Sequence, residues 1–178
     1  MRLKTFATFL VLFSATLAYG IQTETEWIKF TSPEGRFSLL LPNLPKLEVV
    51  PDPKNEKLTH NRFSEFEQGY AFVIEYFDNM SITDREKYLD GFRDGLIREI
   101  NGTLVQENKI SLEGYPGREL ELSITTSNGG NVLGRTRIYA VGSTLYSMSY
   151  LWRKDMDSNI ASRISERYFS SIKLLPNK

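Results

Sequence analysis

The sequence predicts a single α+β domain with a largely antiparallel sheet and one helix on each face of that sheet. Three observations support this fold class. Short alternating apolar segments, bounded by Gly, Pro and Asn turns, recur along the chain; two segments have the apolar period of an amphipathic helix; and one segment is apolar on both faces. A chain of 178 residues can bury a core without a metal or a disulfide, and this one contains no cysteine.

The first 20 residues have the pattern of a cleavable secretory signal. Arg2 and Lys4 precede an apolar run over 6–17, and Ala18-Tyr19-Gly20 places small residues at the −3 and −1 positions of a cleavage site. A retained membrane anchor is the alternative, but the run is shorter than the about 20 residues that a span needs. We therefore expect a signal peptide at 1–20 and one domain at 21–178, in a periplasmic or secreted protein.

The charge of the chain argues against nucleic-acid binding. Removal of the signal takes away Arg2 and Lys4 and no acid, which leaves 20 basic and 22 acidic side chains and a formal net charge of −2. Binding to nucleic acid depends on neutralising phosphates, so a slightly acidic protein is poorly suited to it. After the signal, no segment is long and apolar enough to predict a transmembrane helix.

Two short strands, 27–31 and 37–41, flank a Ser32-Pro33-Glu34-Gly35 turn near the start of the predicted domain. The next segment, 42–58, contains four of the seven prolines. Because it lacks a regular apolar pattern, we expect a long surface loop there.

A hairpin follows, with strands at 59–67 and 70–77 joined by Gln68-Gly69. The second strand is apolar on both faces, so it is expected to be central in the sheet. The first helix is predicted to begin with a capping box made by Thr83 and Glu86 and to end at Asn101-Gly102.

After this helix the sequence predicts an antiparallel run of four strands and then a second helix. The strands are expected at 104–112, 118–126, 132–141 and 144–152, with turns at 113–117, 128–131 and Gly142-Ser143. The second helix is predicted over 158–169, with Ile160, Ala161, Ile164 and Tyr168 facing inward.

Two groups of residues resemble PsbP-like domains, the group that includes the photosystem II extrinsic protein and exported bacterial relatives. The first group is Trp27, the run Phe30-Thr31-Ser32-Pro33-Glu34-Gly35-Arg36-Phe37-Ser38, and Leu41-Pro42. The second is Gly114-Tyr115-Pro116-Gly117-Arg118-Glu119, Arg137-Ile138-Tyr139 and Leu145-Tyr146. The resemblance implies the Mog/PsbP-like α/β/α sandwich and a role in binding or assembly, and it implies no particular site residues.

Few residues are candidates for chemistry. His60 is the only histidine, and no second ligand or nucleophile is placed beside it by spacing, so it is expected to be exposed or to cap a turn. Acidic residues that could bind calcium, Asp52, Glu56, Asp78, Asp84 and Glu86, lack the spacing of an EF-hand. We therefore predict no catalytic residues, no metal site and no cofactor.

The best candidate for a partner surface comes from the geometry of the last hairpin. If Gly142-Ser143 is a two-residue loop, side-chain alternation places six aromatic and basic residues on one face of the sheet. They are Arg135, Arg137, Tyr139, Tyr146, Tyr150 and Trp152. Tyr, Trp and Arg dominate binding hot spots. In the alternative, which we favour because such sheets are usually covered, a helix packs on this face and the arginines reach its rim.

Three functions remain in competition. The first is an exported, non-catalytic binding or assembly module whose partner is an envelope or extracellular protein. The second is a carrier of a small apolar ligand, which predicts a cavity bounded by Tyr139, Tyr146 and Trp152. The third is a hydrolase that uses His60, which predicts that His60 lies in a cleft with a partner within hydrogen-bond reach.

Overall fold

The computed structural model of the chain describes residues 26–52, 55–67, 69–126 and 129–176. The signal peptide predicted at 1–20 lies outside the described residues. Within the described ranges, no helix is both long and apolar enough to span a membrane.

The main element is an antiparallel seven-stranded sheet in the order β3-β4-β5-β9-β8-β7-β6. Its strands are β3 (Lys46–Asp52), β4 (Asn55–Glu67), β5 (Tyr70–Phe77), β6 (Gly102–Leu112), β7 (Tyr115–Thr125), β8 (Asn131–Val141) and β9 (Thr144–Arg153). The doubly apolar strand, β5, lies inside the sheet between β4 and β9, as predicted.

A second, three-stranded sheet in the order β1-β2-β10 brings together the two ends of the described chain. It is formed by β1 (Ile28–Ser32), β2 (Phe37–Leu41) and β10 (Lys173–Leu174). The sequence pattern predicted β1 and β2 but missed β10, because a strand of two residues has no period to detect.

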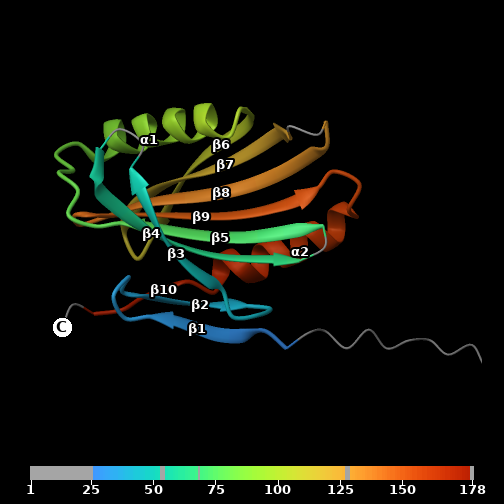
Figure 1. Cartoon of the computed structure of the whole chain (residues 1–178), viewed down its shortest axis with the longest axis horizontal. Coiled ribbons are helices and arrows are strands. Elements are labelled where there is room, and N and C mark those ends of the chain that lie inside the picture. The colour runs from blue at the N-terminus through green and yellow to red at the C-terminus, as the bar shows by residue number, and fades with distance from the viewer. Residues whose placement is uncertain (1–25, 53–54, 68, 127–128, 177–178) are drawn as a thin grey trace, which may run out of the picture.

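The layers are those of the predicted α+β sandwich (Figure 1). Helix α1 (Arg85–Glu99) lies on one face of the large sheet, where Leu89 packs on Ile138, Ala140 and Leu145. Helix α2 (Ser158–Ser170) and the small sheet share the other face. There the main core joins the small sheet, the large sheet and α2, and it includes Phe37, Phe72, Tyr146, Tyr150 and Tyr168.

The register predicted for the last hairpin is confirmed. Val141 is opposite Thr144, Tyr139 is opposite Tyr146, and the pairing continues to Leu133 opposite Trp152. The two-residue loop therefore sets which side chains share each face of these two strands, as the alternation rule requires.

The loop predicted at 42–58 is wrong. Most of this segment is β-structure, because β3 occupies Lys46–Asp52 and β4 begins at Asn55. Pro51 is tolerated because β3 is an edge strand, where a missing N–H need not break the ladder.

The predicted start of α1 is also wrong by one residue. Asp84 is the N-cap, and its carboxylate accepts a hydrogen bond from the backbone N–H of Lys87. Glu86 does not close a capping box with Thr83; it accepts hydrogen bonds from Arg118 at 2.6 Å and from Lys109 at 2.9 Å. These bonds lower the pKa of Glu86 to about 2.

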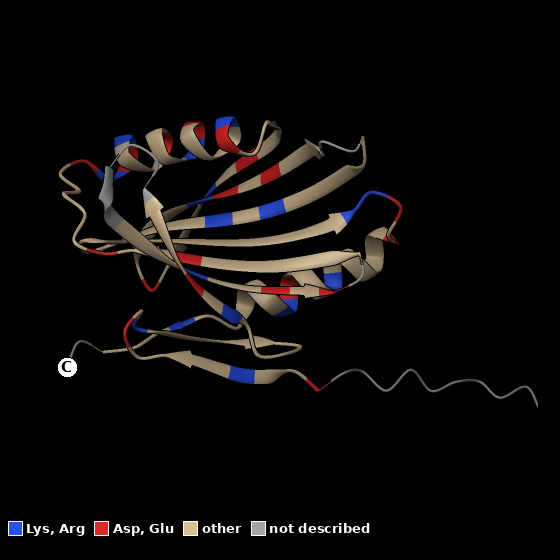
Figure 2. Ribbon diagram, viewed as in Figure 1, with Lys and Arg blue, Asp and Glu red and all other residues tan. Residues whose placement is uncertain are grey.

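Arg118 is the centre of an ion-pair cluster between α1 and the sheet. Its side chain is buried and pairs with Glu86, Asp90 and Glu107. Figure 2 shows that basic and acidic residues occur together on α1 and on neighbouring strands of the large sheet. This cluster attaches α1 to strands β6 and β7 by charged contacts.

Candidate functional site

The structure separates the six residues predicted as a partner surface into two groups. Tyr139, Tyr146 and Tyr150 are 2%, 1% and 0% exposed, so they are part of the core. Arg135, Arg137 and Trp152 are only half-buried. All six lie on the predicted face, but only the second group reaches solvent.

The buried tyrosines are covered by the small sheet and by neighbouring strands. The ring of Phe37 packs against Tyr146 at 6.1 Å between centroids, and Phe72 stacks on Tyr150 at 5.0 Å. The Tyr146 hydroxyl donates a hydrogen bond to the Gly35 carbonyl at 2.8 Å. These contacts fill the space in which the carrier hypothesis requires a cavity.

The two arginines of this face are neutralised by acids of the same chain. Arg137 pairs with Glu119 at 2.6 Å, and its guanidinium lies over the ring of Phe169 at 4.8 Å. Arg135 pairs with Glu121 and Glu166. Their charges are therefore already balanced before any partner arrives.

His60 is not the exposed residue that we expected. Its Nε2 lies 3.2 Å from Oε1 of Glu75, and its ring stacks on Phe77 at 4.3 Å between centroids. The same Glu75 oxygen accepts a 2.7 Å hydrogen bond from Arg62. The structure therefore places an acid within hydrogen-bond reach of His60, as the hydrolase hypothesis predicted, and among the described residues no Ser, Thr or Tyr hydroxyl bonds to the ring.

Three of the acidic residues considered as calcium ligands have other partners in the structure. Asp78 pairs with Arg36, Asp84 caps α1, and Glu86 pairs with Arg118. In the described ranges, no three His, Asp or Glu side chains come together in an arrangement that could hold a metal ion.

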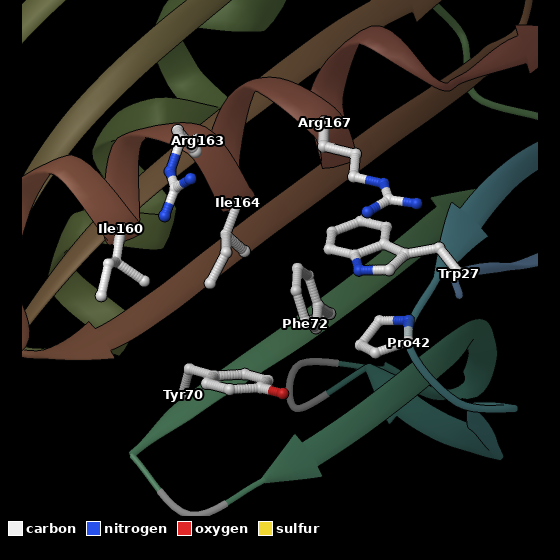
Figure 3. Close-up of a pocket in the computed structure, with 8 residues that line it drawn as sticks. All are labelled: Trp27, Pro42, Tyr70, Phe72, Ile160, Arg163, Ile164 and Arg167. Carbon is white, nitrogen blue, oxygen red and sulfur yellow. The ribbon is translucent and has the colours of Figure 1, made fainter. Parts of the chain in front are cut away.

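The structure reveals an apolar groove that the sequence analysis missed (Figure 3). It lies between α2, the start of β5 and the residues that flank β1 and β2, and we call it the α2 groove. It encloses about 220 Å³ and is lined by Trp27, Pro42, Tyr70, Phe72, Ile160, Arg163, Ile164 and Arg167.

Two local patterns build the α2 groove. Ile160, Arg163, Ile164 and Arg167 follow the i, i+3, i+4, i+7 spacing that aligns side chains on one face of a helix. Tyr70 and Phe72 are two positions apart on β5 and therefore point to the same side. The spacing was visible in the sequence, but Trp27, Pro42, Tyr70 and Phe72 come from about 90 or more positions earlier in the chain, and no local pattern connects them to α2.

Contacts between aromatic rings fix the positions of the side chains that line the α2 groove. Trp27 meets Phe72 edge to face at 5.5 Å between centroids, and Phe72 meets Tyr70 in the same way at 5.6 Å. The guanidinium of Arg167 lies over the Trp27 ring at 4.8 Å. Ile160 remains 41% exposed at the groove rim, so the prediction that this residue faces the core is wrong.

The groove has a positive rim. Within the described part of the chain, neither Arg163 nor Arg167 forms an ion pair with a carboxylate, unlike Arg135 and Arg137. Figure 3 shows both guanidinium groups beside the apolar floor. An unpaired cation next to exposed apolar surface is suited to a ligand that is apolar and carries an acid.

A buried carboxyl lies beside Phe72, on the same face of the sheet as the groove. Glu65 is opposite Phe72 in the β4–β5 ladder and is 6% exposed; burial raises the pKa of its carboxyl. Asn43, next to Pro42 of the groove, donates hydrogen bonds to Glu65 at 3.0 Å and to Glu67 at 2.9 Å. These bonds fix the chain segment that forms this side of the groove.

No protein-family model matches the sequence, and no curated protein matches it either. Solved structures do match in shape. The chain is similar to cyanobacterial PsbP (CyanoP) from Synechocystis sp. PCC 6803, with a TM-score of 0.59 and 11% identity over 87% of this chain and 96% of that one. It is also similar to the Saccharomyces cerevisiae Ran-binding protein Mog1p, with a TM-score of 0.50 and 12% identity over 85% of this chain and 96% of that one. At such low identity these likenesses establish the architecture alone: the chain has the PsbP-like fold.

Proposed function

We propose that this protein is an exported, non-catalytic binding module that holds a short segment of a protein partner in the α2 groove. The observation that carries the proposal is the pairing of an apolar, aromatic floor with two arginines that have no acidic partner in the described chain. The segment would place an apolar side chain on Trp27 and Tyr70 and a carboxylate against Arg163.

The composition of the groove favours a protein partner. Tyr, Trp and Arg are the residue types enriched in binding hot spots, and an Arg–carboxylate contact adds a directional, charge-assisted bond. The groove volume of about 220 Å³ is below the roughly 300–1,000 Å³ of sites for small molecules, so it suits one anchoring side chain better than a whole ligand. This comparison disfavours the small-molecule carrier.

The fold supports the same proposal. One protein of similar structure, Mog1p, is named for binding Ran, so this architecture can present a protein-binding surface. The identity of that partner does not transfer at 12% sequence identity.

Export is the second part of the proposal and rests on the sequence of 1–20. A basic start, an apolar run and small residues before Ile21 are the features of a cleaved signal. The partner would then be an envelope or extracellular protein, and the module would act in the periplasm or outside the cell.

Site-specific crosslinking tests the proposal. A photo-crosslinking amino acid at the exposed position 160 should capture a specific protein from the envelope or secreted fraction of the native cell. Capture should fall about tenfold or more when Arg163→Glu and Arg167→Glu are combined, because two attractive contacts become repulsive. The intact mass of the recovered chain shows whether it begins at Ile21.

Lys29→Glu is the matched control. Lys29 is an exposed cation on β1, outside the groove, and its reversal changes the net charge in the same direction. Capture that falls equally with Lys29→Glu reflects charge alone and contradicts the groove. A small molecule that co-purifies and blocks crosslinking would instead favour the carrier.

A further inference from the structure

One edge of the large sheet is open and regular. Strand β3 pairs only with β4, so its outer backbone groups have no strand partner in the described chain. Its register with β4 is continuous from Lys46 to Pro51 and shifts only at the end of the strand, between Pro51 and Asp52, whereas the opposite edge strand, β6, has a bulge at Val105. Bulges discourage edge pairing, so the segment Lys46–Val50 is the part of β3 that is open to it.

The β3 edge is also apolar on its exposed side. Leu44, Leu47 and Val49 are 73%, 53% and 62% exposed. Leu47 and Val49 are two positions apart and therefore share one face of the strand. Natural edge strands usually avoid such side chains, so their presence here indicates a surface that another strand covers.

The charges on the other face of β3 are self-complementary. Lys46 and Glu48 share that face, lie 3.5 Å apart as an ion pair, and remain largely exposed. If two copies of β3 pair antiparallel with Leu47 at the centre, Lys46 of each copy is opposite Glu48 of the other. Opposite charges directly across an antiparallel pair are favourable. Centring the pair on Lys46 or on Glu48 would place like charges opposite each other, and centring it on Val49 would place Glu48 opposite Val50, so that Glu48 has no cation directly across from it.

We propose that β3 is a self-association edge, on which a second copy of this chain adds its own β3 in the Leu47-centred antiparallel register. The two large sheets then form one continuous sheet across a two-fold axis. Leu47 of each copy packs on Leu47 of the other, and two Lys46–Glu48 pairs cross the interface. None of these residues lines the α2 groove, so the inference stands independently of the proposed function.

Charge variants test this register. Wild-type protein should form a dimer whose mass in analytical ultracentrifugation depends on concentration. Lys46→Glu and Glu48→Lys should each weaken dimerisation roughly tenfold or more, because both cross-strand pairs become repulsive. An equimolar mixture of the two variants should recover the dimer, since the all-acidic edge of one matches the all-basic edge of the other. Circular dichroism confirms that each variant is folded.

Cysteine substitution provides a second, independent measurement, because the chain has no cysteine. In the Leu47-centred register, Leu47→Cys places two thiols on directly opposed residues, about 4.5–5.5 Å apart at Cα, within reach of a disulfide. Val49→Cys is the control: it is equally accessible and on the same face, but the two copies would be four positions out of register, about 13 Å apart. Under mild oxidation only the first should give a covalent dimer.

Three results would overturn the proposal. One is a wild-type protein that sediments as a monomer at millimolar concentration. Another is a dimer that neither charge variant weakens, or that mixing the variants fails to restore. The last is disulfide formation at position 49 to the same extent as at position 47, which would indicate random collision instead of a fixed register.

Discussion

Gly117 illustrates how close packing around one position can leave no room for a side chain. An added Cβ at this position would lie 2.5 Å from the Ile138 carbonyl oxygen and 2.5 Å from Cδ1 of Tyr139. The sequence analysis placed Gly117 in a turn, yet it lies within β7, opposite Tyr139. The glycine is required because the tyrosine ring packs across the neighbouring strand, which no local pattern reveals.

Gly117→Ala is therefore expected to destabilise the fold by about 1–3 kcal/mol, the usual cost of forcing extra volume into a packed core. Gly91→Ala is the comparison. Gly91 lies on α1 with no atom near the added Cβ, so alanine should raise the free energy of unfolding by about 0.5–1 kcal/mol. Chemical denaturation of both variants measures the two changes. Equal changes in the free energy of unfolding for the two variants would contradict a steric clash with Tyr139.

Residue patterns predicted which side chains share a face, but not which of them stay exposed. Alternation correctly grouped Arg135, Arg137 and Tyr139 with their partners across the hairpin. Whether that face is a surface or a core depends on β2, which arrives from a distant part of the chain and packs Phe37 over Tyr146. Such burial depends on contacts between distant parts of the chain. The α2 groove was not predicted for the same reason.

Among the elements, α2 depends on a single side chain at its start. The Asp157 carboxylate accepts hydrogen bonds from the backbone N–H groups of Asn159 at 2.8 Å and Ile160 at 3.1 Å. This cap fixes the first turn of α2, the turn that carries the rim residue Ile160. The shape of the groove is therefore linked to the order of the helix N-terminus.

Asp157→Ala should cost about 1 kcal/mol of stability, as lost N-caps generally do. It should also speed amide hydrogen exchange at residues 159–161 more than in the rest of α2, because the freed N–H groups open locally. Asp155→Ala is the control, since Asp155 is a nearby exposed acid that pairs with Arg153 and caps nothing. Uniform acceleration across the helix would contradict a local role for the cap.

Helices and strands with a clear apolar period were predicted from the sequence, and segments with an ambiguous pattern were not. Both helices and the β8–β9 hairpin have clear periods and turns, and the structure confirms them. Strand β3 was missed because prolines normally exclude sheet structure, a rule that does not hold at an edge. The start of α1 was misplaced by one residue because Thr83 and Asp84 are both good caps; in the structure Asp84 accepts from the Lys87 N–H, while Glu86 bonds to Arg118.

At the scale of the whole molecule, a few buried hydroxyls tie the layers together. Tyr146 on β9 donates to the Gly35 carbonyl, which joins the large sheet to the turn between β1 and β2. Tyr168 on α2 donates to the Val73 carbonyl on β5 at 3.1 Å. Each bond crosses a layer boundary, and the boundary at the β1–β2 turn also carries the Arg36–Asp78 ion pair.

Tyr146→Phe is expected to lower the free energy of unfolding by about 1–3 kcal/mol, because it leaves the buried Gly35 carbonyl without its donor while keeping the ring. Tyr115→Phe, at an exposed position, should change the stability little. Thermal and chemical unfolding followed by two probes would also show whether the small sheet still unfolds together with the large one. A loss below a few tenths of a kcal/mol would mean that the Tyr146 hydroxyl contributes nothing to the joining of the layers.

The strand pairing in the small sheet implies an order in which the parts of the chain fold. Strand β2 pairs with β1 beside it in the chain and with β10, the last strand, at Lys173–Leu174 (Figure 1). Contacts between such distant segments form late, because the whole intervening chain must be ordered first. During synthesis, one side of the core therefore stays open until β10 has been added. Until that strand pairs, apolar side chains of the core remain accessible in the nascent chain.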